Sequence, residues 1–443
     1  MLTRTLLSSI LATAVMVAVS AGTISADTGW EPCLPACEPC NPIFLALSAK
    51  DRDCNPCEPI GCLPEPCEVI SCDPYEPVCR SSAFKLFRGG SRLKVNGWVE
   101  AGIIANSHGA YSNGGTFLYA PALSRFNMNQ LGLSIEREID TSKGFDWGAR
   151  ADFLYGIQGL GVQSFGDESF DYGWDSGGDY GAGFNQLYLT LGYKKLSVDI
   201  GKIGTPIGWE ETRSWNNFFY SHSNVYYIEP VAHTGFLTHY AVNDWLTVSA
   251  GWVGGMDTFV NRFGDSAFLG GFEAAVTKNG TLHYYVYKGR QCEGELPISR
   301  NMRNGGLGDV DYFLQSICYE WNVTDRLTYL LQYDLNNCNP CDRGVARWSA
   351  YGINNHLLYQ INDKWAAGFR FEWMRDNGGE AGWLGETKGD YYQYTWGLNW
   401  NPTEHLRIRP ELRYDIAHGV TPFGRNADKS TQFSGGIGIL WGF

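Results

Sequence analysis

Charged and apolar side chains alternate along the segment from residue 406 to residue 415. Its odd positions hold five charges: Arg407, Arg409, Glu411, Arg413 and Asp415. Leu, Ile, Pro, Leu and Tyr occupy the even positions. Because successive side chains of a strand point to opposite faces, all five charges fall on one face. Opposite charges arranged in this way can line a water-filled passage and act on the ions that cross it.

Two other segments carry the same arrangement. Arg370 and Glu372 alternate with aromatic and small residues in segment 364–375, and Arg150 and Asp152 do so in segment 145–156. These four side chains join Arg407, Arg409, Glu411 and Arg413 as candidate pore-lining residues.

A second group of charges lies in the long connection 205–233. It contains Glu210, Glu211 and Arg213, surrounded by Trp209, Trp215, Phe218, Phe219 and Tyr220. We expect the aromatic rings to pack on the strand wall and the two glutamates to face Arg407, Arg409 and Arg413. Such opposed charges would set a transverse field across a constriction. The alternative is an ordinary outer loop with its charges in water.

The common catalytic motifs are absent from the sequence. None of the patterns G-x-S-x-G, H-E-x-x-H and G-x-x-x-x-G-K-[ST] occurs. The acidic, Gly-rich stretch 167–179 lacks the spacing of an EF-hand and is better explained as a solvated tip than as a calcium site. The net charge of −13 leaves no basic face for nucleic acid. We therefore predict no enzyme activity, cofactor, metal ion or nucleic-acid partner.

Sixteen candidate strands position these residues. They are 92–105, 126–137, 145–156, 184–193, 196–204, 234–242, 245–254, 267–277, 281–288, 310–321, 326–335, 348–361, 364–375, 391–400, 405–415 and 431–443. The 54 Gly, 25 Tyr, 23 Phe and 16 Trp residues suit many strands and turns better than a helical bundle. No window after the N-terminal segment holds 18 consecutive apolar residues, so any later membrane span must be made of strands.

Short and long connections alternate between these strands without exception. The short ones are 140–144, 194–195, 243–244, 278–280, 322–325, 362–363 and 401–404. The long ones are 106–125, 157–183, 205–233, 255–266, 289–309, 336–347, 376–390 and 416–430. All long connections therefore lie at one end of the sheet, as the outer loops of an outer-membrane barrel do, and both termini lie on the periplasmic side.

The second face of the strands is rich in aromatic residues, which concentrate at strand ends. Those at the ends include Trp147, Tyr155, Trp365, Trp373, Trp441 and Phe443. Aromatic girdles at the two membrane interfaces require this distribution. With one uniformly polar face, the strands are expected to close around water. The predicted fold is all-β: an antiparallel transmembrane β-barrel of about 16 strands with an N-terminal Cys/Pro-rich extension.

The N-terminal region divides into two parts. Residues 1–26 have a positive start at Arg4, a short apolar run and small residues at candidate cleavage sites, which indicates a signal peptide. Residues 27–80 contain nine of the 13 cysteines and ten of the 18 prolines. Because the chain is expected to be exported, we favour disulfides over zinc for the C-x-x-C pairs, and the odd count allows a thiol for an intermolecular link. A further pair, Cys338 and Cys341, is expected in a later loop.

The domain organisation that follows is a signal peptide at 1–26, a periplasmic Cys/Pro-rich segment and linker at 27–90, and the barrel at 91–443. The last strand alternates through Ile439 and Trp441 to a C-terminal Phe443. This ending resembles the signal that the outer-membrane barrel assembly machinery recognises.

The sequence resembles the OmpL-like family of β-barrel porins over residues 84–443. The resemblance lies in Leu93–Glu100, Phe126–Ser134 and Val198–Glu210. It implies an outer-membrane barrel for a solute that the family does not assign. In sixteen-stranded general porins the connection that corresponds to 205–233 folds into the lumen.

We therefore predict an outer-membrane porin that allows passive diffusion of small hydrophilic solutes or ions. Its expected partners are outer-membrane lipid, the barrel assembly machinery, the solutes and two further copies in a homotrimer. Two alternatives remain open: a structural or adhesive outer-membrane barrel, and a secreted all-β carbohydrate-binding protein.

Overall fold

The computed structural model describes residues 92–109, 125–164, 170–176, 179–259, 266–291, 310–340, 348–377 and 388–442. The predicted signal peptide, the Cys/Pro-rich segment and Phe443 lie outside these ranges. The short 3₁₀ helices within these ranges are η2 (Thr141–Lys143), η3 (Gln158–Leu160), η4 (Ser214–Asn216) and η5 (Val225–Ile228). Among the described residues, no helix is long and apolar enough to cross a membrane.

The described strands are β1 (Leu93–Asn106), β2 (Asn127–Arg137), β3 (Phe145–Gly156), β4 (Asp175–Ser176), β5 (Tyr180–Tyr193), β6 (Leu196–Gly204), β7 (Ala232–Asn243), β8 (Leu246–Val253), β9 (Ser266–Thr277), β10 (Gly280–Gln291), β11 (Val310–Thr324), β12 (Leu327–Pro340), β13 (Trp348–Asn362), β14 (Trp365–Asp376), β15 (Gly389–Thr403), β16 (Leu406–His418) and β17 (Thr431–Gly442).

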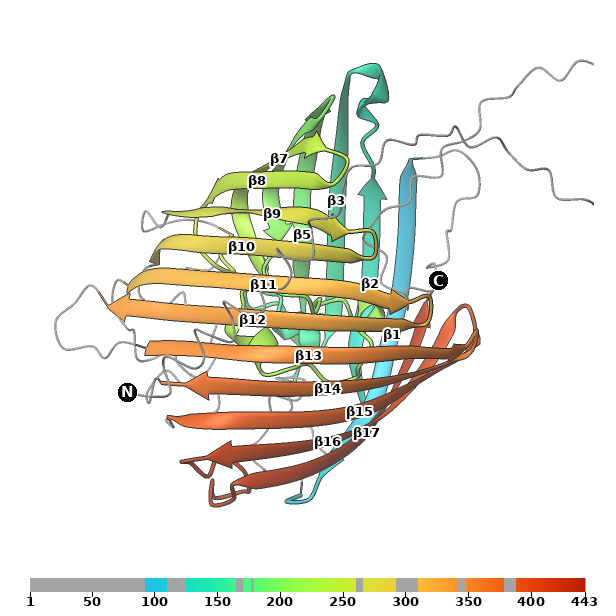
Figure 1. The fold of residues 1–443 in the computed structure, drawn as a ribbon, viewed down its shortest axis with the longest axis vertical. Helices are drawn as coiled ribbons and strands as arrows, with labels where there is room; N and C mark the ends of the chain where they lie inside the picture. The colour runs from blue at the N-terminus through green and yellow to red at the C-terminus, as the bar shows by residue number, and fades with distance from the viewer. Residues whose placement is uncertain are drawn as a thin grey trace, which may run out of the picture. The chain divides into compact units, whose positions relative to one another are not determined.

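The strands form a closed antiparallel barrel (Figure 1). Each long strand pairs with its neighbours along the chain, and β1 closes the ring by pairing with both β2 and β17. The two-residue strand β4 belongs to the connection between β3 and β5, and it pairs only with β5 in the described part. Without β4, the barrel has sixteen strands among the described residues. The closed ring leaves no open sheet edge, which a strand-built membrane span requires.

All sixteen predicted strands are present, and the predicted alternation of short and long connections is confirmed. The turn between β5 and β6 has only two residues, and Tyr193 pairs with Leu196 across it. Lys194 in this turn has a φ of +54°, a left-handed conformation that tight hairpins need. One placement was wrong: β12 pairs with β11 as far as Pro340, so Cys338 lies buried in a strand and not in a loop.

The two faces of the barrel differ as the alternation predicts. Trp396 and Leu412 point outward and keep 47% and 51% of their surface exposed, whereas Arg409 and Glu411 point inward and are buried. A soluble protein rarely exposes so large an apolar surface. The outside of this barrel is therefore suited to contact with lipid.

The inside of the barrel is not uniformly polar, contrary to the expectation from sequence. A buried apolar cluster includes Tyr287, Leu314 and Met374 on the inner wall. Ile207 and Ile228, from the connection between β6 and β7, belong to the same cluster. The wall can carry apolar residues here because the connection covers them and keeps water away.

Candidate constriction site

The connection between β6 and β7 covers residues 205–231 and folds into the barrel. Figure 1 shows its green coils behind β11 to β13, within the ring of strands. We call it the inner loop. Its aromatic residues Trp215, Phe218, Phe219 and Tyr220 are all buried. In a loop that extends into the outer solvent these side chains would be exposed. The sequence prediction that these aromatic residues pack on the wall is confirmed.

Glycines of the wall provide the space for these rings. A Cβ atom added to Gly102, Gly436 or Gly438 would lie within about 3.2 Å of the Tyr220 ring. A Cβ atom on Gly368 would lie 2.3 Å from Phe218. Because these positions have no side chain, the rings lie directly on the strand backbone. Any larger residue on the inner face would push the inner loop away from the wall.

Arginines of β16 hold the backbone carbonyls of the inner loop. Arg409 Nη1 donates to the carbonyl oxygens of Ser214, Asn217 and Phe219 at 3.0, 2.9 and 3.0 Å. Arg413 Nη1 donates to the His222 carbonyl oxygen at 2.7 Å. The five N–H donors of a guanidinium allow one side chain to bind several carbonyls at once.

Arg407 holds the same stretch of the loop nearer the short turns. Its Nη1 donates to the Trp215 carbonyl oxygen at 3.1 Å, and its guanidinium lies 5.3 Å from the centre of the Trp215 ring. A cation over an aromatic face adds an electrostatic attraction to the hydrogen bond.

Carboxylates of the same wall hold the backbone N–H groups. Glu411 accepts from the N–H groups of Tyr220 and Ser221 at 2.9 and 3.2 Å. Glu372 accepts from those of Asn224 and Val225, each at 2.7 Å. A buried backbone that forms no regular secondary structure needs such partners for its polar groups. The charged side chains of the wall thus make the hydrogen bonds that backbone partners would make in a helix or sheet.

The predicted partners of the two loop glutamates were wrong. Glu210 does not face Arg407, Arg409 or Arg413: its Oε1 lies 2.6 Å from Arg370 Nη1. Those three arginines are occupied by loop carbonyls and, for Arg409, by Glu100. Each guanidinium points to the backbone carbonyls that need a hydrogen-bond donor. Carbonyl groups occur at every residue, so the sequence does not show which of them an arginine will bind.

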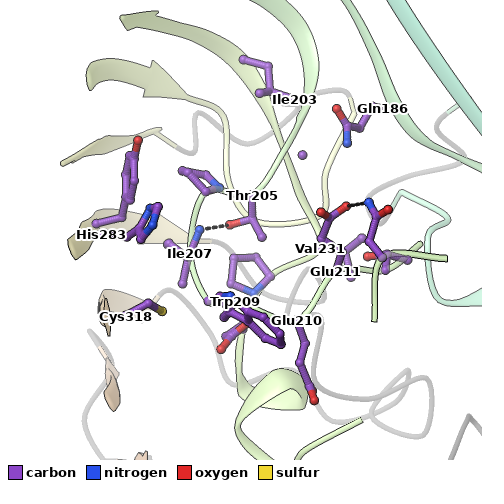
Figure 2. Close-up of a pocket in the computed structure, with 18 of the residues that line it drawn as sticks. Gln186, Ile203, Thr205, Ile207, Trp209, Glu210, Glu211, Val231, His283 and Cys318 are labelled. Carbon is purple, nitrogen blue, oxygen red and sulfur yellow. Dashed lines mark hydrogen bonds between the residues drawn. The ribbon is translucent and has the colours of Figure 1, made fainter. Parts of the chain in front are cut away.

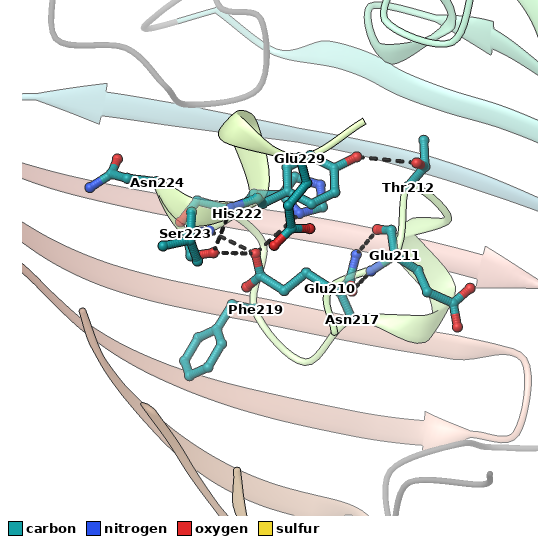
Figure 3. A network of polar contacts seen from close by, with 12 residues as sticks. Glu210, Glu211, Thr212, Asn217, Phe219, His222, Ser223, Asn224 and Glu229 are labelled. Carbon is teal, nitrogen blue, oxygen red and sulfur yellow. Dashed lines mark hydrogen bonds and ion pairs between the residues drawn. The ribbon is translucent and has the colours of Figure 1, made fainter. Parts of the chain in front are cut away.

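Glu210 is buried, and His222 and Ser223 of the inner loop lie beside its carboxylate (Figure 3). Its Oε2 accepts from the backbone N–H and the hydroxyl of Ser223, both at 2.8 Å. Burial alone would raise the pKa of Glu210, but the Arg370 guanidinium and His222 outweigh burial and hold this pKa below its ordinary value. The carboxylate is therefore charged and serves to fix the loop.

Glu211, Arg213, Arg150 and Asp152 form a separate row of charges. Arg213 Nη2 lies 2.7 Å from Glu211, and its Nη1 lies 3.9 Å from Asp152. Arg150 Nε lies 3.1 Å from Asp152. The side chains of Glu211 and Arg213 remain 31% and 19% exposed, in contrast to the buried charges Arg370, Glu372 and Arg409.

The acidic stretch expected at a solvated tip lies only partly in solvent. Asp171 is fully buried, and its carboxylate accepts from the backbone N–H groups of Ser164 and Phe184 at 2.8 and 2.9 Å. Asp175 is exposed, and residues 167 and 168 lie outside the described ranges. Asp171 therefore organises its own connection, which the spacing of acidic residues could not indicate.

A cavity of about 320 Å³ lies between the inner loop and the wall formed by β5 to β11. Glu211 of the loop and His283 and Cys318 of the wall border it from different sides (Figure 2). Asp199, Glu273 and Glu320 also line it. The sequence prediction missed these acids because each strand here carries few charges, and no row of charges marks them.

Side chains on this wall form a chain of hydrogen bonds and close contacts across β6 to β10. His239 Nε2 lies 3.4 Å from Asp199, and its Nδ1 lies 2.8 Å from Ser249 Oγ. The Tyr285 hydroxyl lies 3.3 Å from the same oxygen and donates to Glu273 at 3.0 Å. The chain fixes the carboxylates of Asp199 and Glu273 at its two ends, both on the cavity wall.

A second connection supports the end of the inner loop. Asp257, between β8 and β9, accepts from the N–H groups of Val231 and Ala232 at 2.7 and 2.8 Å. Burial raises the pKa of Asp257 to about 6. Asp257 thus fixes the joint between the inner loop and β7.

A closed barrel with an apolar outside, charges inside and a connection fixed across its lumen defines a diffusion channel of the outer membrane. The chain belongs to the family described as "Putative beta-barrel porin-2, OmpL-like", whose model matches residues 92–443. It is an outer-membrane porin that allows passive passage of small hydrophilic solutes. No curated protein sequence matches the chain.

Solved outer-membrane channels share the fold. OmpF of Salmonella typhi, in complex with daunomycin, has a TM-score of 0.53 and 10% identity; the match covers 81% of this chain and 100% of OmpF. The channel DcaP of Acinetobacter baumannii has a TM-score of 0.52 and 10% identity, and the match covers 82% of this chain and 99% of DcaP. The anion-selective porin of Comamonas acidovorans has a TM-score of 0.51 and 10% identity, and the match covers 79% of this chain and 99% of that porin. At these identities the likeness concerns the fold alone.

Proposed function

We propose that solutes cross this porin between the inner loop and the wall of β5 to β11, without any chemical reaction, and that cations cross more readily than anions. The observation that carries the proposal is the cavity of about 320 Å³ beside the inner loop. Its volume is at the lower end of small-molecule sites, about 300–1,000 Å³, so only small solutes would fit. The opposite side of the lumen is filled by the buried contacts between the loop and β14 to β17.

The charges around the cavity support a preference for cations. The cavity is lined by acidic side chains, which include Glu211, Asp199, Glu273 and Glu320. Among the described residues, one arginine, Arg213, lines it. A narrow space with one excess sign of charge concentrates ions of the opposite sign. The pathway thus contrasts with the anion selectivity that the name of the Comamonas acidovorans porin states.

The same proposal includes the partners of the channel and its place in the outer membrane. Lipid would cover the outward apolar face, and the barrel assembly machinery would bind the last strand, where Ile439 and Trp441 point outward ahead of Phe443. Residues 27–90 would lie in the periplasm. Three copies would associate, as in the trimer form of OmpT of Vibrio cholerae.

Replacement of Glu211 by Gln tests the pathway. Removal of one charge a few ångströms from a permeating ion changes the energy of that ion by about 0.4–1 kcal/mol at high effective dielectric, so the cation-to-anion permeability ratio should fall about two- to fivefold. Reversal potentials in planar bilayers under a KCl gradient measure this ratio. Glu404→Gln is the matched control, because this residue lies in the short turn after β15 with 73% of its side chain exposed. An anion-selective wild type, or equal ratios for Glu211→Gln and wild type, would refute the proposed pathway.

A further inference from the structure

Two carboxyl groups lie together in the interior, where the inner loop ends. Glu229 belongs to the loop and Asp334 to β12, and both are buried, with exposed fractions of 6% and 0%. Gln332 Nε2 donates to both carboxyls, to Glu229 at 2.5 Å. One amide group therefore bridges two acids that come from distant parts of the chain. We call Glu229 and Asp334 the acid pair.

No cation from the described part of the chain neutralises the acid pair. In the described ranges neither carboxyl forms an ion pair with Lys, Arg or His; Arg370 is bound to Glu210 instead. The groups that face the pair are Ser316 and Cys318 on β11, Gln332 on β12, and Glu210 of the loop, which is itself negative. Asp334 Oδ1 is buried and has no hydrogen-bond partner.

Two carboxylates in such a site cannot both ionise at low cost, so the pair retains a proton. Burial raises the pKa of Glu229 well above its ordinary value, and the Asp334 carboxyl raises it further. A shared proton turns repulsion between the two acids into a hydrogen bond.

Both ends of the inner loop meet at Glu229. Gly208, near the start of the loop, has a φ of +85°, and a Cβ atom there would lie 1.9 Å from Glu229 Oε2. Gly208 N–H donates to Ser316 Oγ at 3.2 Å. On the other side, Asn336 Nδ2 donates to the Ile228 carbonyl oxygen at 2.7 Å. The two ends of the loop are thus bound to β11 and β12 beside the acid pair.

We propose that the proton shared by Glu229 and Asp334 is a latch that fixes the inner loop to the wall, and that loss of this proton frees this end of the loop and widens the passage. The inference rests on the proposed function, because the passage runs along the loop and Glu229 lines the cavity. An acid whose pKa is raised on folding stabilises the folded state at low pH and loses this contribution as the pH rises through the raised value. The latch is therefore closed at acidic pH and opens towards alkaline pH.

Single-channel conductance of the full-length protein in planar bilayers, measured from pH 5 to pH 10, tests the latch. The wild type should show a stepwise increase in conductance as the pH rises, and Glu229→Gln should show none. The amide of the variant can still accept from Gln332 and can donate to Asp334, so the latch stays closed without a titratable proton. Cys318→Ser is the matched control, since this thiol borders the same site, and the variant should keep the step. A wild type without a step, or a step that persists in Glu229→Gln, would overturn the latch.

A measurement that does not depend on conduction separates the latch from the proposed function. At pH 9, hydrogen–deuterium exchange of peptides from 206–231 should be faster in the wild type than in Glu229→Gln, because loss of the shared proton frees the loop only in the wild type. Both proteins are compared at the same pH, so that their intrinsic exchange rates are equal. Equal exchange in the two proteins would disprove the latch even if the pathway through the cavity is correct. Faster exchange in the wild type together with unaltered selectivity in Glu211→Gln would retain the latch and remove the pathway.

Discussion

The charged residues of the inner wall act chiefly as anchors of the inner loop. Arg370 illustrates this role, because it is fully buried and donates to Glu210, to the Ser221 carbonyl oxygen at 2.8 Å and to Gln393 at 2.8 Å. A buried guanidinium is tolerated only when such partners satisfy it. The same alternation of charges that suggested a charged pore face in the sequence therefore serves, on β14 and β16, to position the loop that narrows the pore.

Replacement of Arg370 by Met should destabilise the barrel and loosen the inner loop. The change leaves Glu210 as a buried charge without its ion partner, which costs about 3–5 kcal/mol. Urea titration of the refolded protein, followed by tryptophan fluorescence, measures the loss of unfolding free energy. Arg375→Met is the matched control on the same strand: its pair with Asp390, at 2.6 Å, is partly exposed and should contribute at most about 1 kcal/mol. Equal losses for the two variants would contradict the anchoring role.

At the scale of elements, the inner loop and the wall are matched by shape as well as by charge. The Tyr220 ring lies against glycines of two neighbouring strands, β1 and β17. Glycine is disfavoured within strands unless a close approach requires it. Here the close approach is that of the loop aromatics, so these glycines are part of the constriction.

Gly438 and Gly435, three positions apart on β17, allow a matched test of this fit. A Cβ atom at Gly438 would lie 2.4 Å from Tyr220 Cδ2, whereas one at Gly435 would meet nothing closer than 3.5 Å. Gly438→Ala should lower the unfolding free energy by about 1–3 kcal/mol through overpacking and alter the conductance. Gly435→Ala should stay within about 0.5 kcal/mol of the wild type. The measurements are urea titration and single-channel conductance, and a neutral Gly438→Ala variant would show that the loop does not depend on this contact.

At the scale of the whole molecule, the outward apolar face distinguishes the remaining alternatives. A secreted carbohydrate-binding protein would place residues such as Trp396 and Leu412 in a dry core, but both are about half exposed on the outside of a closed ring. A structural or adhesive barrel would share that outside. The cavity beside the inner loop and the membership of a porin family favour the channel.

A charge introduced on the outward face should be costly in the membrane. Leu412 is the central residue of β16, and Leu412→Arg should reduce the unfolding free energy in lipid bilayers by about 2–4 kcal/mol, the cost of an arginine near the bilayer midplane. Glu404→Arg, in the exposed turn after β15, serves as the control and should cost less than about 1 kcal/mol. Urea-dependent folding into vesicles gives both values. A tolerated arginine at position 412 would mean that lipid does not surround this face.

The sequence by itself determined the strands, their order of short and long connections, and which side chains face outward. These features depend on a period of two residues and on local turn chemistry, so a window of about ten residues suffices to predict them. Which inward groups meet was decided only by the tertiary structure. Glu210 and Arg370 are 160 positions apart, and Glu229 and Asp334 are 105 positions apart (334 − 229). Contacts at such separations depend on the closure of the ring and on the course of the inner loop, whose backbone groups compete for the same charges.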